Sequence, residues 1–376
     1  MGTIDFSSFE YIPILAIRPA EMSALEELPQ KDIDLILPIF PLKGWVGSNH
    51  LDNTLERIKK SISNRPWIAD IDKFFSRSET VLDNNGSYKR PVFEEVDNLL
   101  DSKNGYQNWF EFLQNIPEAV PTLQLEDLNE LLPQLERLTE LKRGLVANLD
   151  VSQLKTQSAS RIENIETVLD VLQHASERSI LIIFNLGKIT TELLDVKDSI
   201  LRLLEMAKSK VPNSKIAFSG SSFPDGFANQ EDNENPILER QLYSYFLNYF
   251  DRDTLKYSDF GSARVSEAQG GGGPPVPRID YPLKDDWRFI RRELYGDLDK
   301  EEIYSEIAKD MINKDYWNKS LNLWGTQLIY LTAASDDIGI TSAAKATAAR
   351  INIHLYNQLH YYTPIDEIDS DEDWID

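Results

Sequence analysis

The sequence predicts an α/β protein, specifically a (β/α)8 TIM-like barrel with additions, and two observations lead to this fold class. The first is a set of eight short apolar runs rich in β-branched residues, which read as parallel strands buried on both faces. The runs are Tyr11–Ile17, Leu35–Phe40, Trp67–Ile71, Val120–Leu123, Leu145–Leu149, Ile180–Leu186, Ile216–Phe218 and Leu255–Ser258.

The second observation is the helical spacing of apolar residues between these runs. Leu128, Leu131, Leu135 and Leu138 share one helix face, and residues 162–172 carry another. A right-handed crossover helix between successive parallel strands, repeated around a ring, closes a barrel. In a chain of 376 residues, a barrel of roughly 250 residues leaves room for additions.

Three additions interrupt or follow the predicted barrel. Residues 73–118 are too long for one crossover helix and form an insertion after the third strand. The Gly/Pro-rich segment Gln269–Pro277 predicts a linker after the eighth strand. We therefore expect a barrel core at 1–262 and an extension at 263–364 that packs on the barrel.

The extension and the end of the chain have their own patterns. Arg278–Tyr281 and Trp287–Arg291 predict a hairpin, and Ile303–Ile312 and Ala343–Gln358 predict helices, the second capped near Ser342. Residues 365–376 contain seven carboxylates and no base. We expect this segment to be a disordered acidic tail, either solubilising or able to dock on a basic partner.

Charge and composition restrict the partners. The net charge of −23 argues against binding nucleic acid through a basic surface and against binding anionic membranes. The chain has no cysteine, and no apolar run is long enough to cross a bilayer. The first ten residues do not resemble a signal peptide, so a cytoplasmic location is expected.

The carboxyl ends of the strands are where barrel enzymes place their chemistry. Asp70 and Asp259 are candidate catalytic residues there, as general bases, and His354 is a candidate for stabilising charge with Arg350, four residues earlier on the same helix face. Few carboxylates and no histidines cluster at the strand ends, so we predict no metal site. His354 and Arg350 either project into the mouth of the barrel or lie on the surface.

The segment after the seventh strand is the most site-like local feature. Ser219, Gly220, Ser221 and Ser222 place three hydroxyls and a glycine where barrels bind phosphate, and Arg18 or Arg350 would add positive charge. These residues are candidates for binding a phosphate-containing small molecule. The alternative is a tight polar turn that caps the next element.

Several short motifs carry a family resemblance. They are YIPIL at 11–15, IAD at 68–70, SGSSFP at 219–224, SDFG at 258–261, RIDY at 278–281 with Trp287, and RINIH at 350–354. With these motifs the chain resembles the beta protein family, the phage T4 beta-like proteins of phages and bacteria. The resemblance implies a barrel encoded in phages or near defence genes, and supplies no catalytic motif.

Two functions remain open. The first is a ligand- or partner-binding barrel subunit in a phage–host conflict system, either an anti-phage defence or phage-encoded, with a protein as its expected partner. The second is a hydrolase or phosphodiesterase-like barrel enzyme acting on a phosphorylated substrate. In it Asp70 and Asp259 would act as base or as metal ligands, and Ser221 and Ser222 would contact the phosphate. Charge would be stabilised by Arg18, Arg350 and His354. No motif identifies a cofactor, and barrels host many chemistries.

Overall fold

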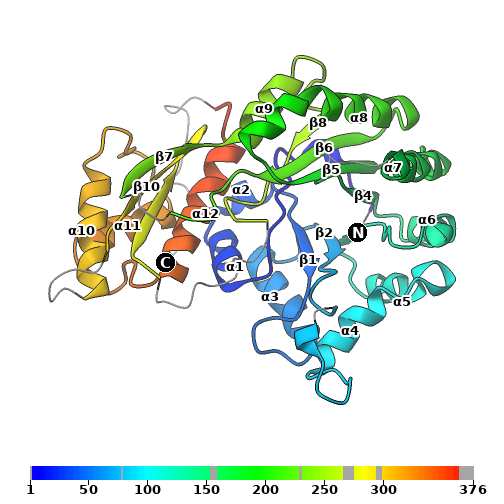
Figure 1. Ribbon diagram of the computed structural model, residues 1–376, viewed down its shortest axis with the longest axis horizontal. Coiled ribbons are helices and arrows are strands. Elements are labelled where there is room, and N and C mark those ends of the chain that lie inside the picture. Colours follow the sequence, from blue (N-terminus) through cyan, green and yellow to red (C-terminus); the bar gives the residue numbers. More distant parts are fainter. Residues whose placement is uncertain are drawn as a thin grey trace. The chain divides into compact units, whose positions relative to one another are not determined.

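The computed structural model describes residues 2–77, 79–152, 159–227, 231–265, 275–293 and 299–363. The chain has a mixed α/β fold with parallel sheets, which confirms the predicted class. It divides into two compact units (Figure 1). Unit 1 comprises residues 1–17, 36–220 and 242–259, and unit 2 comprises 18–35, 221–241 and 260–376. The boundaries expected at 1–262 and 263–364 stay a prediction.

The strands of unit 1 form two parallel sheets. One has the order β1-β2-β3 and the other the order β4-β5-β6-β8. Their bounds are β1 Ile39–Leu42, β2 Trp67–Ile71, β3 Ala119–Pro121, β4 Leu145–Asp150, β5 Ile180–Lys188, β6 Lys215–Ser221 and β8 Leu255–Tyr257. Each overlaps one of the predicted runs, and β2, β3 and most of β5 and β6 are buried, as strands covered on both faces are.

Isolated parallel bridges link the two sheets. Thr122, directly after β3, pairs with Val146 of β4. The first predicted run is present as bridges: Tyr11 pairs with both Ile36 and Tyr257, and Ile14 pairs with Ile39. The segment at 11–14 therefore lies between β1 and β8.

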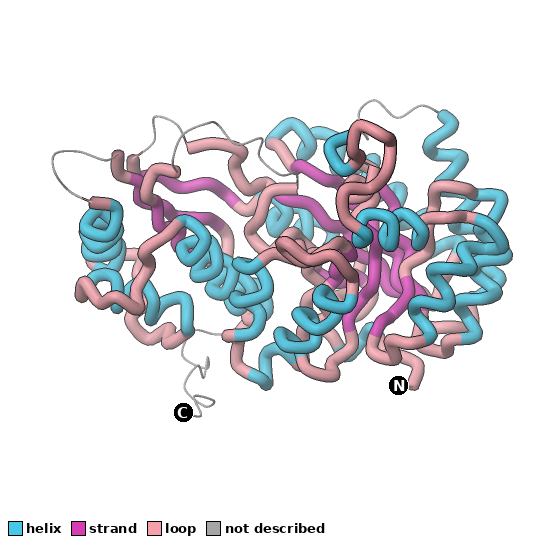
Figure 2. Tube along the Cα trace, turned by 90° about the horizontal axis from the view of Figure 1, so that it is seen from below, coloured by secondary structure: helices cyan, strands magenta, loops and turns pink. Residues whose placement is uncertain are grey.

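Helices connect these strands and lie along their outer side (Figures 1 and 2). The insertion after β2 contains two of them, α4 and α5. The bounds are α3 Asp52–Ile62, α4 Pro91–Leu99, α5 Lys103–Gln114, α6 Leu131–Glu140, α7 Ala159–Leu172, α8 Lys197–Lys210 and α9 Leu238–Phe246. The apolar face predicted from Leu131, Leu135 and Leu138 is buried on α6.

Unit 2 contains a three-stranded antiparallel sheet in the order β7-β10-β9. The predicted hairpin is confirmed as β9 (Arg278–Pro282) and β10 (Asp286–Arg291). The sequence did not predict β7 (Asp232–Pro236), whose DNENP residues have low strand propensity and pair with β10 at the edge of the sheet. Phe223, Phe227, Ile237, Trp287 and Phe289 form a core beside this sheet.

Five helices of the described chain lie wholly in unit 2: α1 (Pro19–Glu26), α2 (Gln30–Ile33), α10 (Lys300–Ile312), α11 (Trp324–Ala333) and α12 (Ala343–Leu359). The predicted cap of α12 is confirmed, since the Ser342 hydroxyl accepts from the Lys345 amide. Although α1 follows the first predicted strand, it packs on α12, where Asn352 donates to the Ala24 carbonyl at 2.9 Å.

Two sequence predictions lie outside the described residues. They are most of the linker at 269–277 and the acidic tail at 365–376. Among the described helices, none is long and apolar enough to cross a membrane.

Candidate functional site

The carboxyl ends of the unit 1 strands bring Asp70 and Asn148 together. Asn148 on β4 donates from Nδ2 to Oδ2 of Asp70 on β2 at 2.9 Å, and the Ile71 amide donates to Oδ1 at 2.8 Å. Because β3 lies between β2 and β4, and each strand step is about 4.8 Å, the two side chains reach toward one another over β3. The side chains of Asp70 and Asn148 therefore share one face of these strands.

Thr122 Oγ1 and Ser219 Oγ, near these ends, are among the buried hydroxyl oxygens that have no hydrogen-bond partner in the described residues. Thr122 pairs in register with Val146, two residues before Asn148, so Thr122 and Asn148 share a face. The Phe218 ring contacts the Phe246 ring of α9, with ring centroids 5.2 Å apart. Because side chains alternate along a strand, Ser219 lies on the face of β6 that points away from α9. Both are candidate ligand contacts.

Asp259 follows β8 and lies on the other face. It is fully buried, Tyr11 donates to Oδ1 and Tyr257 donates to Oδ2 at 3.0 Å. Tyr257 also contacts Tyr243 of α9 edge-on, at 5.2 Å between centroids. Asp259 therefore lies on the same side of β8 as Tyr257, which is the side that faces the helices. Asp70 lies on the other side of the strands.

Gly220 has a packing role in unit 1. A Cβ atom on this residue would lie 2.6 Å from Cδ1 of Ile189 and 3.0 Å from the Gly187 carbonyl oxygen. The close approach for which glycine is needed is made by the chain's own Ile189. It does not require a bound anion.

The hydroxyls of Ser221 and Ser222 are engaged within unit 2. Ser221 donates to the Ala263 carbonyl at 2.7 Å. The Ser222 hydroxyl donates to Glu239 at 2.5 Å. It also accepts at 3.0 Å from the amide of Leu238, which is the first residue of α9. This arrangement is the polar turn that caps the next element, the alternative open in the sequence.

Arg350 lies in a buried ion cluster of unit 2. It donates from Nη1 to Oδ2 of Asp280 at 2.7 Å, and Arg278 contacts Oδ1 of the same carboxylate at 2.7 Å. Burial alone would raise the pKa of Asp280, but the two guanidinium groups outweigh it and hold the pKa below its usual value. Burial lowers the pKa of Arg350, although Asp280 opposes this shift.

Aromatic side chains connect this cluster to His354. The Arg350 guanidinium lies 4.1 Å from the Phe223 ring centre, and Phe223 meets Trp287 edge-on at 5.2 Å. Trp287 in turn stacks on His354 at 6.1 Å. Three motifs that carried the resemblance, SGSSFP, RIDY with Trp287, and RINIH, therefore meet in unit 2.

Both His354 and Arg350 are buried, 0% and 5% exposed, so the alternative that they lie on the surface is wrong. They form part of the packing of α12 against β9 and β10 of unit 2. Arg18 lies at the N-cap of α1, also in unit 2, and its side chain makes no capping hydrogen bond.

Sequence reasoning gave no role to Asp280 or Asn148. A signal was present for Asp280, because it is an acid between Ile279 and Tyr281 in a predicted strand, and a buried acid needs a charged partner. For Asn148, the only signal was a polar residue in a run that otherwise reads Leu-Val-Ala-Leu. Among the described residues, no group of three or more His, Asp or Glu could hold a metal ion.

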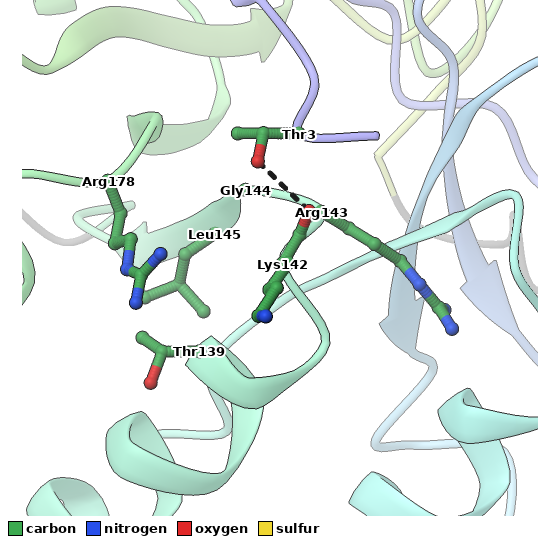
Figure 3. A pocket seen from close by; sticks show the side chains of 7 residues that line it. All are labelled: Thr3, Thr139, Lys142, Arg143, Gly144, Leu145 and Arg178. Atoms are coloured by element: carbon green, nitrogen blue, oxygen red, sulfur yellow. Dashed lines mark hydrogen bonds between the residues drawn. The ribbon is translucent and has the colours of Figure 1, made fainter. Parts of the chain in front are cut away.

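A small pocket lies before β4 in unit 1 (Figure 3). Figure 3 shows Lys142 and Arg178 pointing toward the same space beside Thr139, while Arg143 points away. Its volume of about 10 Å³ is the room for one water molecule. Arg143 instead donates to the Leu113 and Ile116 carbonyls, which makes it a structural residue.

Comparison with known proteins gives the chain's relationships. Residues 11–360 match the family model described as Beta protein. "Protein beta" of Enterobacteria phage P4 is 27% identical over 369 residues, which are 95% of this chain and 94% of that protein. The family expected from the short motifs is confirmed, and this relative comes from phage P4.

Among solved structures, the carboxyl transferase domain of Rhizobium etli pyruvate carboxylase is similar with a TM-score of 0.36 and 10% identity. The match covers 94% of this chain and 48% of that one. The family match extends over nearly the whole chain, and it includes the strands of unit 1 and the motif cluster of unit 2. The chain belongs to the Beta protein family.

Proposed function

We propose that this chain is a ligand- or partner-binding protein of a phage–host conflict system, with its recognition surface at the carboxyl ends of the unit 1 strands. Family membership and the relative from phage P4 support the biological setting. A cytoplasmic location is part of the proposal.

The proposal includes a closed (β/α)8 barrel for unit 1. The parallel pairings β1-β2-β3 and β4-β5-β6-β8 support it, as do the bridges of Tyr11 to Ile36 and to Tyr257. In such a barrel the loops after the strands converge on one mouth, and Asp70, Thr122 and Asn148 would lie there.

The main support for a binding role comes from the hydrogen bonds that the two candidate acids, Asp70 and Asp259, accept from their own chain. Asp70 accepts from Asn148 and the Ile71 amide, and Asp259 accepts from Tyr11 and Tyr257. A general base needs a lone pair directed at the proton it removes, whereas these carboxylates are oriented by neutral donors of their own chain. Such fixed groups, with uncharged hydroxyls beside them, suit recognition.

The alternative of a hydrolase or phosphodiesterase-like enzyme needs Asp70 and Asp259 to act on one substrate. The two carboxylates occupy opposite faces of the strands, and Ser221 and Ser222 bond to their own chain. We therefore favour binding over catalysis.

Two loops near Asp70 support a protein partner. Phe74 follows β2 and is 87% exposed, and Val46 follows the neighbouring strand β1 and is 67% exposed. Large apolar side chains on adjacent loops are typical anchors of an interface. The chain's net charge of −23 favours a basic partner.

The experiment is recovery of what the protein binds in its host. The full chain is purified from that host, and bound proteins and small molecules are identified by mass spectrometry. We expect a molecule whose recovery is lost with Asn148→Ala and kept with the control Asp253→Asn, an exposed acid of unit 1. Equal recovery from both variants would contradict the proposed surface.

A further inference from the structure

We propose that the concave face formed by Asp70, Thr122 and Asn148 binds a primary ammonium group. This inference rests on the proposed binding role of unit 1 and names the chemistry of the ligand. It concerns an amine carried either by a small molecule or by a lysine side chain.

The three side chains are brought together by strand register. Ala69 pairs with Pro121, so Asp70 and Thr122 are the next positions of β2 and of the chain after β3. Thr122 pairs with Val146, and Asn148 follows on the same face. The hydrogen bond from Asn148 to Asp70 shows that these positions face one another.

The face has more acceptors than donors. Thr122 Oγ1 and Asn148 Oδ1 are buried and have no hydrogen-bond partner in the described part of the chain. Asp70 is 9% exposed and Thr122 is 1% exposed. Leaving buried acceptors unsatisfied costs about 1–3 kcal/mol each, so a ligand that donates to them is favoured.

Asp70 also lacks a neutralising cation. Its two donors, Asn148 Nδ2 and the Ile71 amide, are uncharged, and no Lys, Arg or His among the described residues forms an ion pair with it. The nearby Lys43 pairs with Asp72 at 3.7 Å. A carboxylate at this depth favours a positive charge beside it.

A primary ammonium group meets both needs. It carries one positive charge and three N–H donors, and the face offers the Asp70 carboxylate, Thr122 Oγ1 and Asn148 Oδ1. A quaternary ammonium ion has the same charge and no N–H donor, and therefore separates this recognition from general attraction to an acidic protein.

The test is calorimetric titration of the full chain at pH 7 and fixed ionic strength with n-propylammonium chloride, and with tetramethylammonium chloride as the matched control ion. We expect n-propylammonium to bind at least tenfold more tightly. Asp70→Asn should weaken this binding at least tenfold, and Asp253→Asn, which removes the same charge elsewhere in unit 1, should leave it unchanged.

Thr122→Val removes one acceptor with little change of shape, and keeps the proposal testable if Asp70→Asn does not fold. We expect it to weaken binding several-fold. Equal binding of the two ions, or affinity for n-propylammonium that neither variant reduces, would overturn the inference.

A lysine-containing tetrapeptide distinguishes the sources of the amine. Tighter binding of the peptide than of n-propylammonium indicates a protein partner, and the reverse indicates a small molecule. If neither amine binds, but a co-purified molecule is lost with Asn148→Ala, the ammonium inference fails while the proposed binding role stands.

Discussion

The Asn148 side chain on β4 donates a 2.9 Å hydrogen bond to the Asp70 carboxylate on β2, across the intervening strand β3. This bond fixes the orientation of the buried acid at the carboxyl ends of the strands. It also leaves Asn148 Oδ1 directed away from Asp70 as an acceptor. The pair therefore connects the fold of unit 1 to its proposed binding role.

Changing Asn148 to Asp should make stability depend on pH. Two carboxylates at this distance cannot both ionise cheaply, so the folded pair holds one proton to higher pH than the unfolded chain does. The folded state then binds more protons, and the free energy of unfolding falls as pH rises through that window. Urea unfolding at pH 5 and pH 7.5 measures this. An equal loss of stability at both pH values would contradict this prediction. Asn148→Ala, which adds no charge, is the control.

Gly220→Ala should destabilise the protein by about 1–3 kcal/mol, as overpacking does. The new Cβ would lie 2.6 Å from Cδ1 of Ile189. Adding Ile189→Ala should make the double variant more stable than the sum of the two changes predicts. Gly226→Ala is the control, since a Cβ there meets no atom within 4 Å. Equal thermal shifts for Gly220→Ala and Gly226→Ala would rule out the packing role.

Asp280→Asn should destabilise the protein by about 3–5 kcal/mol, because Arg278 and Arg350 lose the anion that compensates their buried charge. Asp286→Asn breaks only the partly exposed pair with Arg288 and should cost less than about 1 kcal/mol. Chemical unfolding of both variants gives these values. Similar losses of stability for the two variants would show that the buried cluster of Asp280, Arg278 and Arg350 stabilises the protein no more than a partly exposed ion pair does.

The lowered pKa of Asp280 also predicts acid sensitivity. The unfolded chain binds a proton to this group at higher pH than the folded chain does. The stabilisation is present above the unfolded value of about 3.9 and is lost as pH falls through the lower folded pKa. Below pH 4, the free energy of unfolding should therefore fall more steeply with decreasing pH for the wild type than for Asp280→Asn. Parallel pH dependences would contradict this role.

Phe74→Ser should leave stability within about 0.5 kcal/mol, as expected for an exposed residue. If the loops after β1 and β2 form an interface, the same change should weaken binding of a recovered protein partner. Thermal unfolding and a titration with that partner measure the two effects. An unchanged affinity for the partner would show that the loop containing Phe74 is not part of the interface.

The sequence predicted an element correctly where the spacing of its apolar residues matches the positions that are buried in the structure. Apolar runs such as Trp67–Ile71 and the α6 face at Leu131, Leu135 and Leu138 are set by local pattern, and the structure contains both. The strand β7 was missed because its polar residues are held by pairing with β10, a non-local effect. The site was harder to predict, because Asp70 is bound by Asn148, 78 positions away, and Asp280 by Arg350, 70 positions away.

The most direct test of a recognition site at Asp70 is mass spectrometry of molecules bound to the full chain from its host, for wild type, Asn148→Ala and Asp253→Asn. The account predicts a bound molecule with wild type and Asp253→Asn that is lost with Asn148→Ala, while all three proteins unfold cooperatively. Recovery of the same molecule in equal amount from Asn148→Ala would contradict it.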